Sequence, residues 1–279
     1  MGALNIAITG ANGFLGQATV RAALAQGHSV LALVRSDASA LPDAVKLCRC
    51  DLAESLPEGA LSGIDAVIHT AAAMSNDQAL LARDTTKATE NLLTAIKRDA
   101  PTAQLVLASS ISVYDAYAVP EGSLLDEAAQ LERQPQKREP YVQAKLEQEA
   151  QAIRADVPLW ILRIGVVYDD TRVWNAHIGQ RLGPLLVSLG RSGEVPLAHV
   201  ANTAEALVLA ALTAPESDAE TLNILDDNLP DRRTFIAGTH KGMHLPLSWR
   251  MLMPVAHCTQ AILGSRAPGL LRPRVLAAR

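Results

Sequence analysis

The sequence predicts an α/β fold in which helices cover both faces of a parallel, doubly wound sheet. Short apolar runs alternate with segments of helical periodicity over roughly the first 165 residues, and a glycine-rich turn follows the first run. Of the 279 residues, 49% are hydrophobic and 19% charged, which is typical of a globular chain. Alternating strands and helices require right-handed crossovers, and these make the strands parallel.

The elements follow in order along the chain. A helix is expected directly after the glycine-rich turn, ending at Gly27, and two more are expected at residues 77–98 and 139–154. Apolar runs predict six strands, at residues 4–8, 29–34, 45–50, 65–70, 104–108 and 158–163. Beyond about Val166 the pattern becomes irregular, which indicates a smaller, interleaved C-terminal region.

The turn between the first strand and the first helix reads ITGANGFLG, residues 8–16, with glycines at positions 10, 13 and 16. At such a turn the free amides of the helix point outward, and the helix dipole favours an anion. Glycine also lets a pyrophosphate approach the backbone. A tight turn without a ligand is the alternative, because the GxxGxxG spacing is one residue longer than the GxGxxG dinucleotide fingerprint.

Two further stretches carry side chains suited to proton transfer. The first, ASSISVY at residues 108–114, follows the fifth strand, and the second, PYVQAK at residues 140–145, opens a helix. Tyr141 and Lys145 are four residues apart and so share a helical face. A neighbouring ammonium group lowers the pKa of a phenol, which suits it to acid–base catalysis. An exposed Tyr–Lys pair without a catalytic role is the alternative.

Together these motifs resemble the extended short-chain dehydrogenase/reductases, also called the NAD-dependent epimerase/dehydratase-like family. The resemblance covers about residues 4–226 and includes TGxxGxxG, SSxxVY, YxxxK and the Leu-Arg pair that ends the sixth strand. It implies a Rossmann-type domain, a nicotinamide cofactor and a catalytic set of Ser110, Tyr141 and Lys145. In the family the tyrosine is the acid/base, the lysine binds the nicotinamide ribose and lowers the tyrosine pKa, and the serine orients the substrate oxygen.

The resemblance also implies which residues contact the cofactor. Arg35 follows Val34, where enzymes that use NAD carry an acidic residue, and an arginine can pair with the 2′-phosphate of NADP. NADP is therefore favoured over NAD, although Asp37 leaves NAD open. The other expected contacts lie in the glycine-rich turn and behind the third and fourth strands: Gly10, Asn12, Gly13, Phe14, Leu15, Gly16, Asp51, Leu52, Ala71, Ala72 and Ala73, with Lys145 at the ribose.

The reaction is inferred from departures from the family pattern. Dehydratases of the family carry an Asp-Glu pair after the catalytic serine, where this chain has Ile111-Ser112. Nucleotide-sugar epimerases carry an arginine for the diphosphate in an RDF-like stretch, where this chain has Val195 and Pro196. The sequence therefore favours an NADP-dependent oxidoreductase that interconverts a ketone or aldehyde and a secondary alcohol on a non-nucleotide substrate. Two alternatives stay open: a sugar or nucleotide-sugar epimerase, and a non-catalytic dinucleotide-sensing protein.

Domain organisation and partners complete the expectations. Residues 1–165 should form the dinucleotide-binding domain, with 200–225 returning to it, and residues 166–199 and 226–279 should bind substrate. The net charge of −4 argues against a nucleic-acid partner. No apolar run approaches the length of a membrane span, and the three cysteines have no CxxC spacing for a metal site. A cytoplasmic enzyme is expected, and the resemblance implies a homodimer formed through the helices at 77–98 and 139–154.

Overall fold

The computed structural model describes residues 2–36, 39–120, 122–173, 178–189, 193–264 and 272–277. Seven parallel strands form the central sheet, in the order β11-β6-β5-β4-β1-β2-β3. The strand order reverses between β1 and β4, which is where doubly wound folds bind ligands. The strands are β1 (Asn5–Thr9), β2 (Ser29–Val34), β3 (Lys46–Arg49), β4 (Ala66–His69), β5 (Gln104–Ser110), β6 (Leu159–Ile164) and β11 (Ala219–Ile224).

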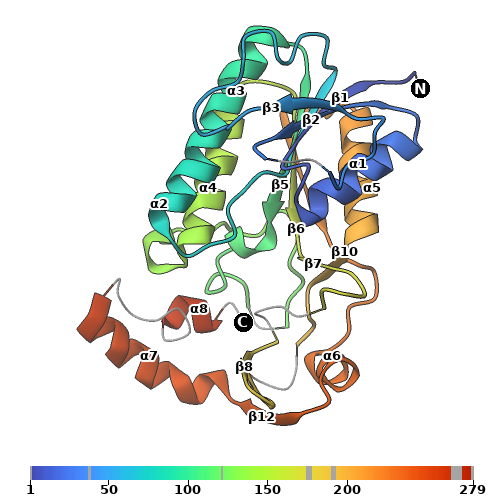
Figure 1. Ribbon diagram of the computed structural model, residues 1–279. Helices are drawn as coiled ribbons and strands as arrows, with labels where there is room; N and C mark the ends of the chain where they lie inside the picture. Colours follow the sequence, from blue (N-terminus) through green and yellow to red (C-terminus); the bar gives the residue numbers. More distant parts are fainter. Residues whose placement is uncertain are drawn as a thin grey trace.

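Helices cover both faces of this sheet (Figure 1). Alternate side chains of a strand point to opposite faces, so Ile6 and Ile8 of β1 pack in one core and Ala7 packs in the other. The first core lies under α1 (Phe14–Ala25) and α5 (Val200–Leu212), and the second under α3 (Ala88–Asp99) and α4 (Pro140–Arg154). The Rossmann-like α/β fold predicted from the sequence is thus confirmed.

The helix expected at residues 77–98 is one helical run with three parts. It starts as α2 (Gln78–Leu81), continues as the π-helical turn η1 (Ala82–Lys87) and ends as α3. The Asp77 side chain caps it by accepting hydrogen bonds from the amides of Ala79 and Leu80. Single π-helical turns within α-helices are frequent at functional sites.

The C-terminal region lies beyond the carboxyl ends of β5 and β6 and has its own small sheets (Figure 1). A short parallel pair joins β7 (Val166–Tyr168) and β10 (Leu197–His199), and a three-stranded sheet joins β8 (Gln180–Leu182), β9 (Leu185–Leu189) and β12 (Met243–Leu247). A small core that includes Leu186, Val195 and Phe235 supports them. The remaining elements are the 3-10 turns η2 (Ile111–Val113) and η3 (Pro135–Lys137) and the helices α6 (Arg232–Thr239), α7 (Trp249–Leu263) and α8 (Pro273–Ala277).

Residues 200–225 supply α5 and β11, and β11 is a seventh strand that the sequence did not predict as such. The assignment of residues 166–199 and 226–279 to substrate binding stays a prediction. No helix of the described part of the chain is long and apolar enough to cross a membrane.

Candidate active site

The three glycines of the turn between β1 and α1 have different reasons to lack a side chain. Gly10 has a φ of +64°, and a Cβ there would lie 2.9 Å from the backbone of Ala71. A Cβ on Gly16 would lie 2.1 Å from the carbonyl oxygen of Gly10. Gly13 is exposed, has an ordinary φ of −72°, and its Cβ would meet only that same carbonyl oxygen, at 3.1 Å. Packing within the protein therefore requires glycine at positions 10 and 16. At position 13 the missing side chain instead allows a ligand to approach the backbone on the outer surface of the turn.

The start of α1 fits an anionic group of such a ligand. Gly13 is the N-cap residue and supplies no side-chain cap, so the first amides of the helix, starting with those of Phe14 and Leu15, have no capping side chain. The carbonyl oxygen of Asn12 accepts a hydrogen bond from Gln17 Nε2 at 2.8 Å, which fixes the turn. This arrangement can hold the pyrophosphate of a dinucleotide.

Ser110 and Tyr141, predicted as catalytic residues, meet at the carboxyl end of β5. Ser110 is the last residue of β5, and Tyr141 follows Pro140 in the first turn of α4. Ser110 Oγ accepts hydrogen bonds from the hydroxyl of Ser112 at 3.0 Å and from its amide at 3.3 Å. Burial raises the pKa of Tyr141 to about 12, and the nearby Ser110 side chain acts in the opposite direction.

Lys145 lies one helical turn after Tyr141 and is only 4% exposed. Its Nζ donates hydrogen bonds to the carbonyl oxygen of Ala108 and to Gln148 Oε1, both at 2.8 Å. Burial lowers the pKa of Lys145 to about 8, against an opposing effect of the Glu149 carboxylate. The expectation that Lys145 lowers the pKa of Tyr141 stays a prediction: burial is the main influence on the pKa of the phenol here, and the ammonium group donates to other acceptors.

A buried hydrogen-bond network behind Lys145 was not predicted. Gln148 Nε2 donates to Thr89 Oγ1 at 2.8 Å and lies 3.0 Å from His69 Nε2, while His69 Nδ1 lies 2.7 Å from Thr9 Oγ1. Because an amide nitrogen can only donate, His69 Nε2 is the acceptor and its proton sits on Nδ1. Burial, followed by the charge of Lys145, lowers the pKa of His69 to about 3, so the imidazole is neutral.

A second buried network contains the Leu-Arg pair at the end of β6. Arg163 donates to both carboxylate oxygens of Glu149, at 3.1 and 2.9 Å, and to the hydroxyl of Tyr114 at 3.0 Å. That hydroxyl donates to Asn223 Oδ1 at 2.7 Å. Ser109 is buried and donates to Glu149 at 2.5 Å, so the two neighbouring serines on β5 have different partners.

The residues predicted for the adenosine end of the cofactor form an exposed ionic cluster behind β2 and β3. Arg35 pairs with Asp84 at 2.9 Å, and Arg83 pairs with Asp51 at 2.5 Å and also with Asp84. The hydrogen bond from Arg83 is the main reason why the pKa of Asp51 is lowered. Leu52 is half-buried beside the cluster. Glu54 is a third carboxylate beside Arg83, at 3.6 Å, so the two guanidinium groups face three carboxylates and the cluster has a small excess of negative charge.

The three predicted alanines follow β4 and line the space between this cluster and the glycine-rich turn. Ala71, Ala72 and Ala73 are each partly exposed. The amide of Ala71 donates to Thr9 Oγ1 at 3.2 Å, and that of Ala73 donates to Thr85 Oγ1 at 2.9 Å. The segment is thus tied to β1 on one side and to the π-helical turn on the other.

A pocket of about 390 Å³ opens beside the glycine-rich turn, in the C-terminal region. The guanidinium of Arg172 stacks on the Phe14 ring, 4.5 Å from its centroid, so this pocket adjoins the start of α1. The described residues that line it are Thr171, Arg172, Val173, Arg181 and Thr239. Two arginines in one pocket favour a phosphate-bearing ligand.

The residues of the site that the sequence analysis did not predict differ in how easily a sequence pattern could have identified them. Gln148 is three residues after Lys145, so helical spacing alone could have placed it on the same face. Arg172 and Arg181 lie where the sequence has no clear periodicity, and nothing in the pattern distinguishes them. Among the described residues, no group of three or more His, Cys, Asp or Glu side chains could hold a metal ion.

Comparison with known proteins places the chain in a family. The structure is similar to the UDP-Glc/GlcNAc 4-epimerase from Campylobacter jejuni (19% identity, TM-score 0.71, 88% of this chain and 87% of that one). It is also similar to MoeE5 in complex with UDP-glucose and NAD (22%, 0.69, 88% and 85%) and to gox2253 (20%, 0.75, 99% and 88%). These identities are low, so the likeness concerns the fold. No curated protein matches the sequence. The model of the NAD dependent epimerase/dehydratase family matches residues 6–224, and the chain therefore belongs to this family.

Proposed function

We propose that the protein is an NAD-dependent epimerase that oxidises and re-reduces one carbon of a nucleotide sugar, using Ser110, Tyr141 and Lys145. The observation that carries the proposal is the placement of Ser110 at the end of β5 beside Tyr141, one helical turn from the buried Lys145, in a member of this family. Of the readings that the sequence left open, the comparisons favour the epimerase over the reductase of a non-nucleotide ketone.

Each side chain has a separate task in this proposal. Ser110 holds the oxygen of the reacting carbon by a hydrogen bond. Tyr141 accepts the hydroxyl proton as the phenolate during oxidation and returns it as the phenol during reduction. Burial raises its pKa, so the protonated form that serves the reduction step predominates at neutral pH, and the oxidation step requires the ionised form. Lys145 provides a buried cation beside the nicotinamide ribose. When bound, the nicotinamide ring would accept the hydride and return it to the other face of the carbon.

The substrate class is supported by the pocket that contains Arg172 and Arg181. The family's arginine in the RDF-like stretch is absent, and Val195 in its place is fully buried in the small C-terminal core. Guanidinium groups bind phosphate oxygens in a bidentate manner, and two of them suit a diphosphate. We therefore infer that these arginines replace the missing one, while the stacking of Arg172 on Phe14 would keep the diphosphate near the start of α1.

NAD rather than NADP is the cofactor we propose. Arg35 lies where the sequence led us to expect it, but Asp84 pairs with it and lies between it and Arg83. A 2′-phosphate would approach three carboxylates, those of Asp51, Glu54 and Asp84, as well as two cations, so the local charge does not favour it. Asp37, the alternative partner for the ribose of NAD, lies outside the described residues.

An NADP-dependent carbonyl reductase is the second candidate. It is favoured by Arg35, which is largely exposed and could turn toward a phosphate, and by Val195 and Pro196 in place of the family's arginine. Both candidates use the same Ser-Tyr-Lys set and differ in whether the cofactor is released in its other redox state.

One experiment separates the two candidates. The purified protein is incubated with NAD and either UDP-glucose or UDP-N-acetylglucosamine, the C4 configuration is followed by NMR, and NADH is followed at 340 nm. An epimerase gives the C4 epimer without net NADH, and Tyr141→Phe abolishes the conversion. Steady oxidation of NADPH with simple ketones, and no epimer, would instead establish the reductase.

Two further expectations accompany the proposal. The homodimer through the helical run at residues 77–98 and the helix at 139–154, and the cytoplasmic location, both stay predictions. Ile153 on α4 is 55% exposed and Leu80 on α2 is 40% exposed, so apolar side chains are available on these helices for a partner copy. A monomeric mass by light scattering at micromolar concentration would contradict the dimer.

A further inference from the structure

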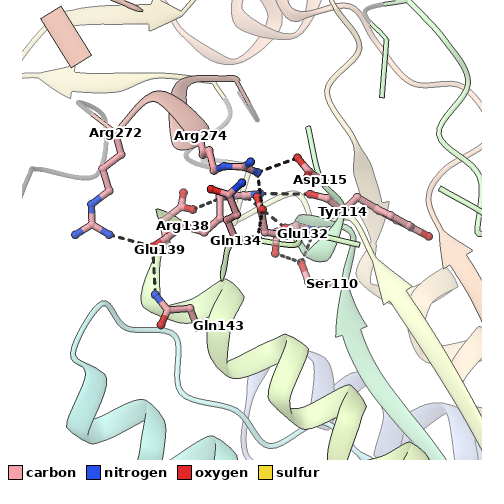
Figure 2. Close-up of polar contacts among 11 residues, drawn as sticks. Ser110, Tyr114, Asp115, Glu132, Gln134, Arg138, Glu139, Gln143, Arg272 and Arg274 are labelled. Atoms are coloured by element: carbon pink, nitrogen blue, oxygen red, sulfur yellow. Dashed lines mark hydrogen bonds and ion pairs between the residues drawn. The ribbon is translucent and has the colours of Figure 1, made fainter. Parts of the chain in front are cut away.

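The short C-terminal helix α8 contacts the loops that hold the catalytic side chains (Figure 2). Arg274 Nη1 donates hydrogen bonds to Asp115 Oδ1 at 3.1 Å and to Glu132 Oε1 at 2.5 Å. The side chains of Asp115 and Glu132 are almost fully buried. Residues more than 140 positions apart in the sequence thus meet directly behind the end of β5.

Arg274 reduces the excess of negative charge among these ionic contacts. Arg138, itself buried, is shared between Glu132 at 3.5 Å and Glu139 at 3.2 Å. With Arg274, the cluster of five holds three carboxylates, including Asp115, and two guanidinium groups. Without it, one cation would face three acids, and a buried carboxylate that loses its partner destabilises its surroundings.

The cluster continues to Ser110 through Arg138. Arg138 Nη1 donates to the carbonyl oxygen of Tyr114, and Nη2 donates to that of Ser112, both at 3.3 Å. Ser112 in turn donates its hydroxyl and its amide to Ser110 Oγ. The turn η2, which directs the Ser110 side chain toward Tyr141, is therefore held from the side of α8.

Arg272, the residue directly before α8, contacts the loop at the start of α4. Arg272 Nη1 donates to the carbonyl oxygen of Arg138 at 3.0 Å, and Gln143 Nε2 donates to the same oxygen at 3.3 Å. Arg138 directly precedes Glu139, the N-cap residue of α4, and Tyr141 lies in the first turn of that helix. Two arginines of one short segment therefore reach both loops that carry the proton-transfer groups.

We propose that α8 and the residue before it set the relative position of Ser110 and Tyr141, with Arg274 and Arg272 as positioning residues that do not touch the substrate. The turnover readout of this inference rests on the proposed epimerase activity. A structural readout makes the inference testable without that activity.

The test compares Arg274→Ala with Arg133→Ala. Arg133 is an exposed arginine in the same loop as Glu132, so its removal changes the net charge equally. Arg274→Ala should lower turnover by about 10- to 100-fold, because small displacements of reacting groups have effects of this size. NAD affinity should be unchanged, and added guanidinium ion should restore part of the rate. Arg133→Ala should behave as wild type.

A double-mutant cycle tests whether the effect of Arg274 on turnover is transmitted through Ser110. Because Arg274 acts through Ser110, Arg274→Ala should have little further effect in a Ser110→Ala background. An equal loss in both backgrounds, or unchanged turnover in Arg274→Ala, overturns the inference. If Arg274→Ala does not fold, Arg274→Lys serves instead, since a lysine keeps the charge but loses the planar fork.

Hydrogen exchange gives the readout that is independent of substrate. The amides of residues 110–114 and 139–143 should exchange faster in Arg274→Ala than in wild type or Arg133→Ala. Unchanged exchange in both segments overturns the inference, even if the enzyme is active. If wild type converts no nucleotide sugar, the proposed function fails, while hydrogen exchange still decides whether α8 positions the two loops.

Discussion

The two ends of the proposed cofactor site hold their charged groups in opposite ways. At the nicotinamide end, Lys145 is 4% exposed and its Nζ binds neutral acceptors, in front of a neutral, buried His69. At the adenosine end, the side chain of Arg35 is 60% exposed and is held by the carboxylate of Asp84. The side chains proposed to act in the reaction therefore lie in the core, whereas the side chains proposed to determine the cofactor preference lie on the surface.

The difference in burial determines how easily the side chains at each end of the site can rearrange or be substituted. Exposed ion pairs contribute at most about 1 kcal/mol each, so the pairs around Arg35 can rearrange when a cofactor binds. A buried network loses far more when one member is removed, because the remaining polar groups stay without water. Substitutions at the two ends should therefore have effects of different size and kind.

The largest effect is expected from removing the phenolic oxygen of Tyr141. Tyr141→Phe keeps the ring and should leave NAD affinity nearly unchanged. General acid–base catalysis contributes about 10²- to 10⁴-fold, so turnover should fall by that factor. Tyr117→Phe, which removes an exposed hydroxyl, is the matched control. Wild-type turnover in Tyr141→Phe would show that another group transfers the proton.

Lys145 should make the stability of the protein depend on alkaline pH. Its pKa is about 8 in the folded chain against an ordinary 10.5, so the unfolded chain binds more protons between these values. Wild type should therefore gain stability relative to Lys145→Met as pH rises from 8 toward 10.5. Between pH 7 and 10 the difference should change by about 2 to 3 kcal/mol in urea unfolding. The exposed Lys97, changed to Met, should show no such dependence.

His69 should act in the opposite pH range. Its pKa is about 3 when folded against an ordinary 6.5, so its contribution is complete above pH 6.5 and is lost as pH falls toward 3. Between pH 7 and 5, wild type should lose about 2 kcal/mol relative to His69→Gln. The exposed His257, changed to Gln, is the control. Parallel pH curves for wild type and His69→Gln would show that the imidazole is not held neutral.

The smallest effect is expected at the adenosine end. Asp84→Asn removes a carboxylate beside Arg35 and Arg83, so binding of NADPH should strengthen about fivefold relative to NADH, in line with the energy of one exposed pair. Arg35→Ala should weaken NADPH and leave NADH unchanged. Glu90→Gln, an exposed change on α3, controls for net charge. An unaltered NADPH-to-NADH ratio in Asp84→Asn would separate this cluster from cofactor preference.

The sequence predicted most of the central fold because five of the first six strands are largely apolar and buried, while β3 is a short, mostly exposed strand at the edge of the sheet. The strand β11 was not identified as a strand, since Glu220 and Asn223 interrupt its apolar residues and it lies at the edge of the sheet. The small C-terminal sheets were not predicted either, because their strands are three to five residues long and depend on tertiary packing.

The candidate site was predictable where its residues follow local motifs and unpredictable where they meet across the chain. Ser110, Tyr141 and Lys145 belong to short patterns with fixed spacing. The contacts of Arg274 with Asp115 and Glu132 join segments that only the folded structure brings together. The true surroundings of Tyr141 and Lys145 also depend on burial, which a local motif does not contain.

The π-helical turn η1 has a consequence for how related sequences should be aligned. Successive side chains of an α-helix are rotated by about 100° around the helix axis. A deletion of one residue in η1 would therefore rotate the side chains that precede the deletion relative to those of α3. Arg83 and Asp84 would then leave the cofactor edge, and Thr85 would lose the amide of Ala73. A one-residue gap at positions 82–87 in a homologue would therefore mark a different adenosine site, although the rest of the helix aligns without a break.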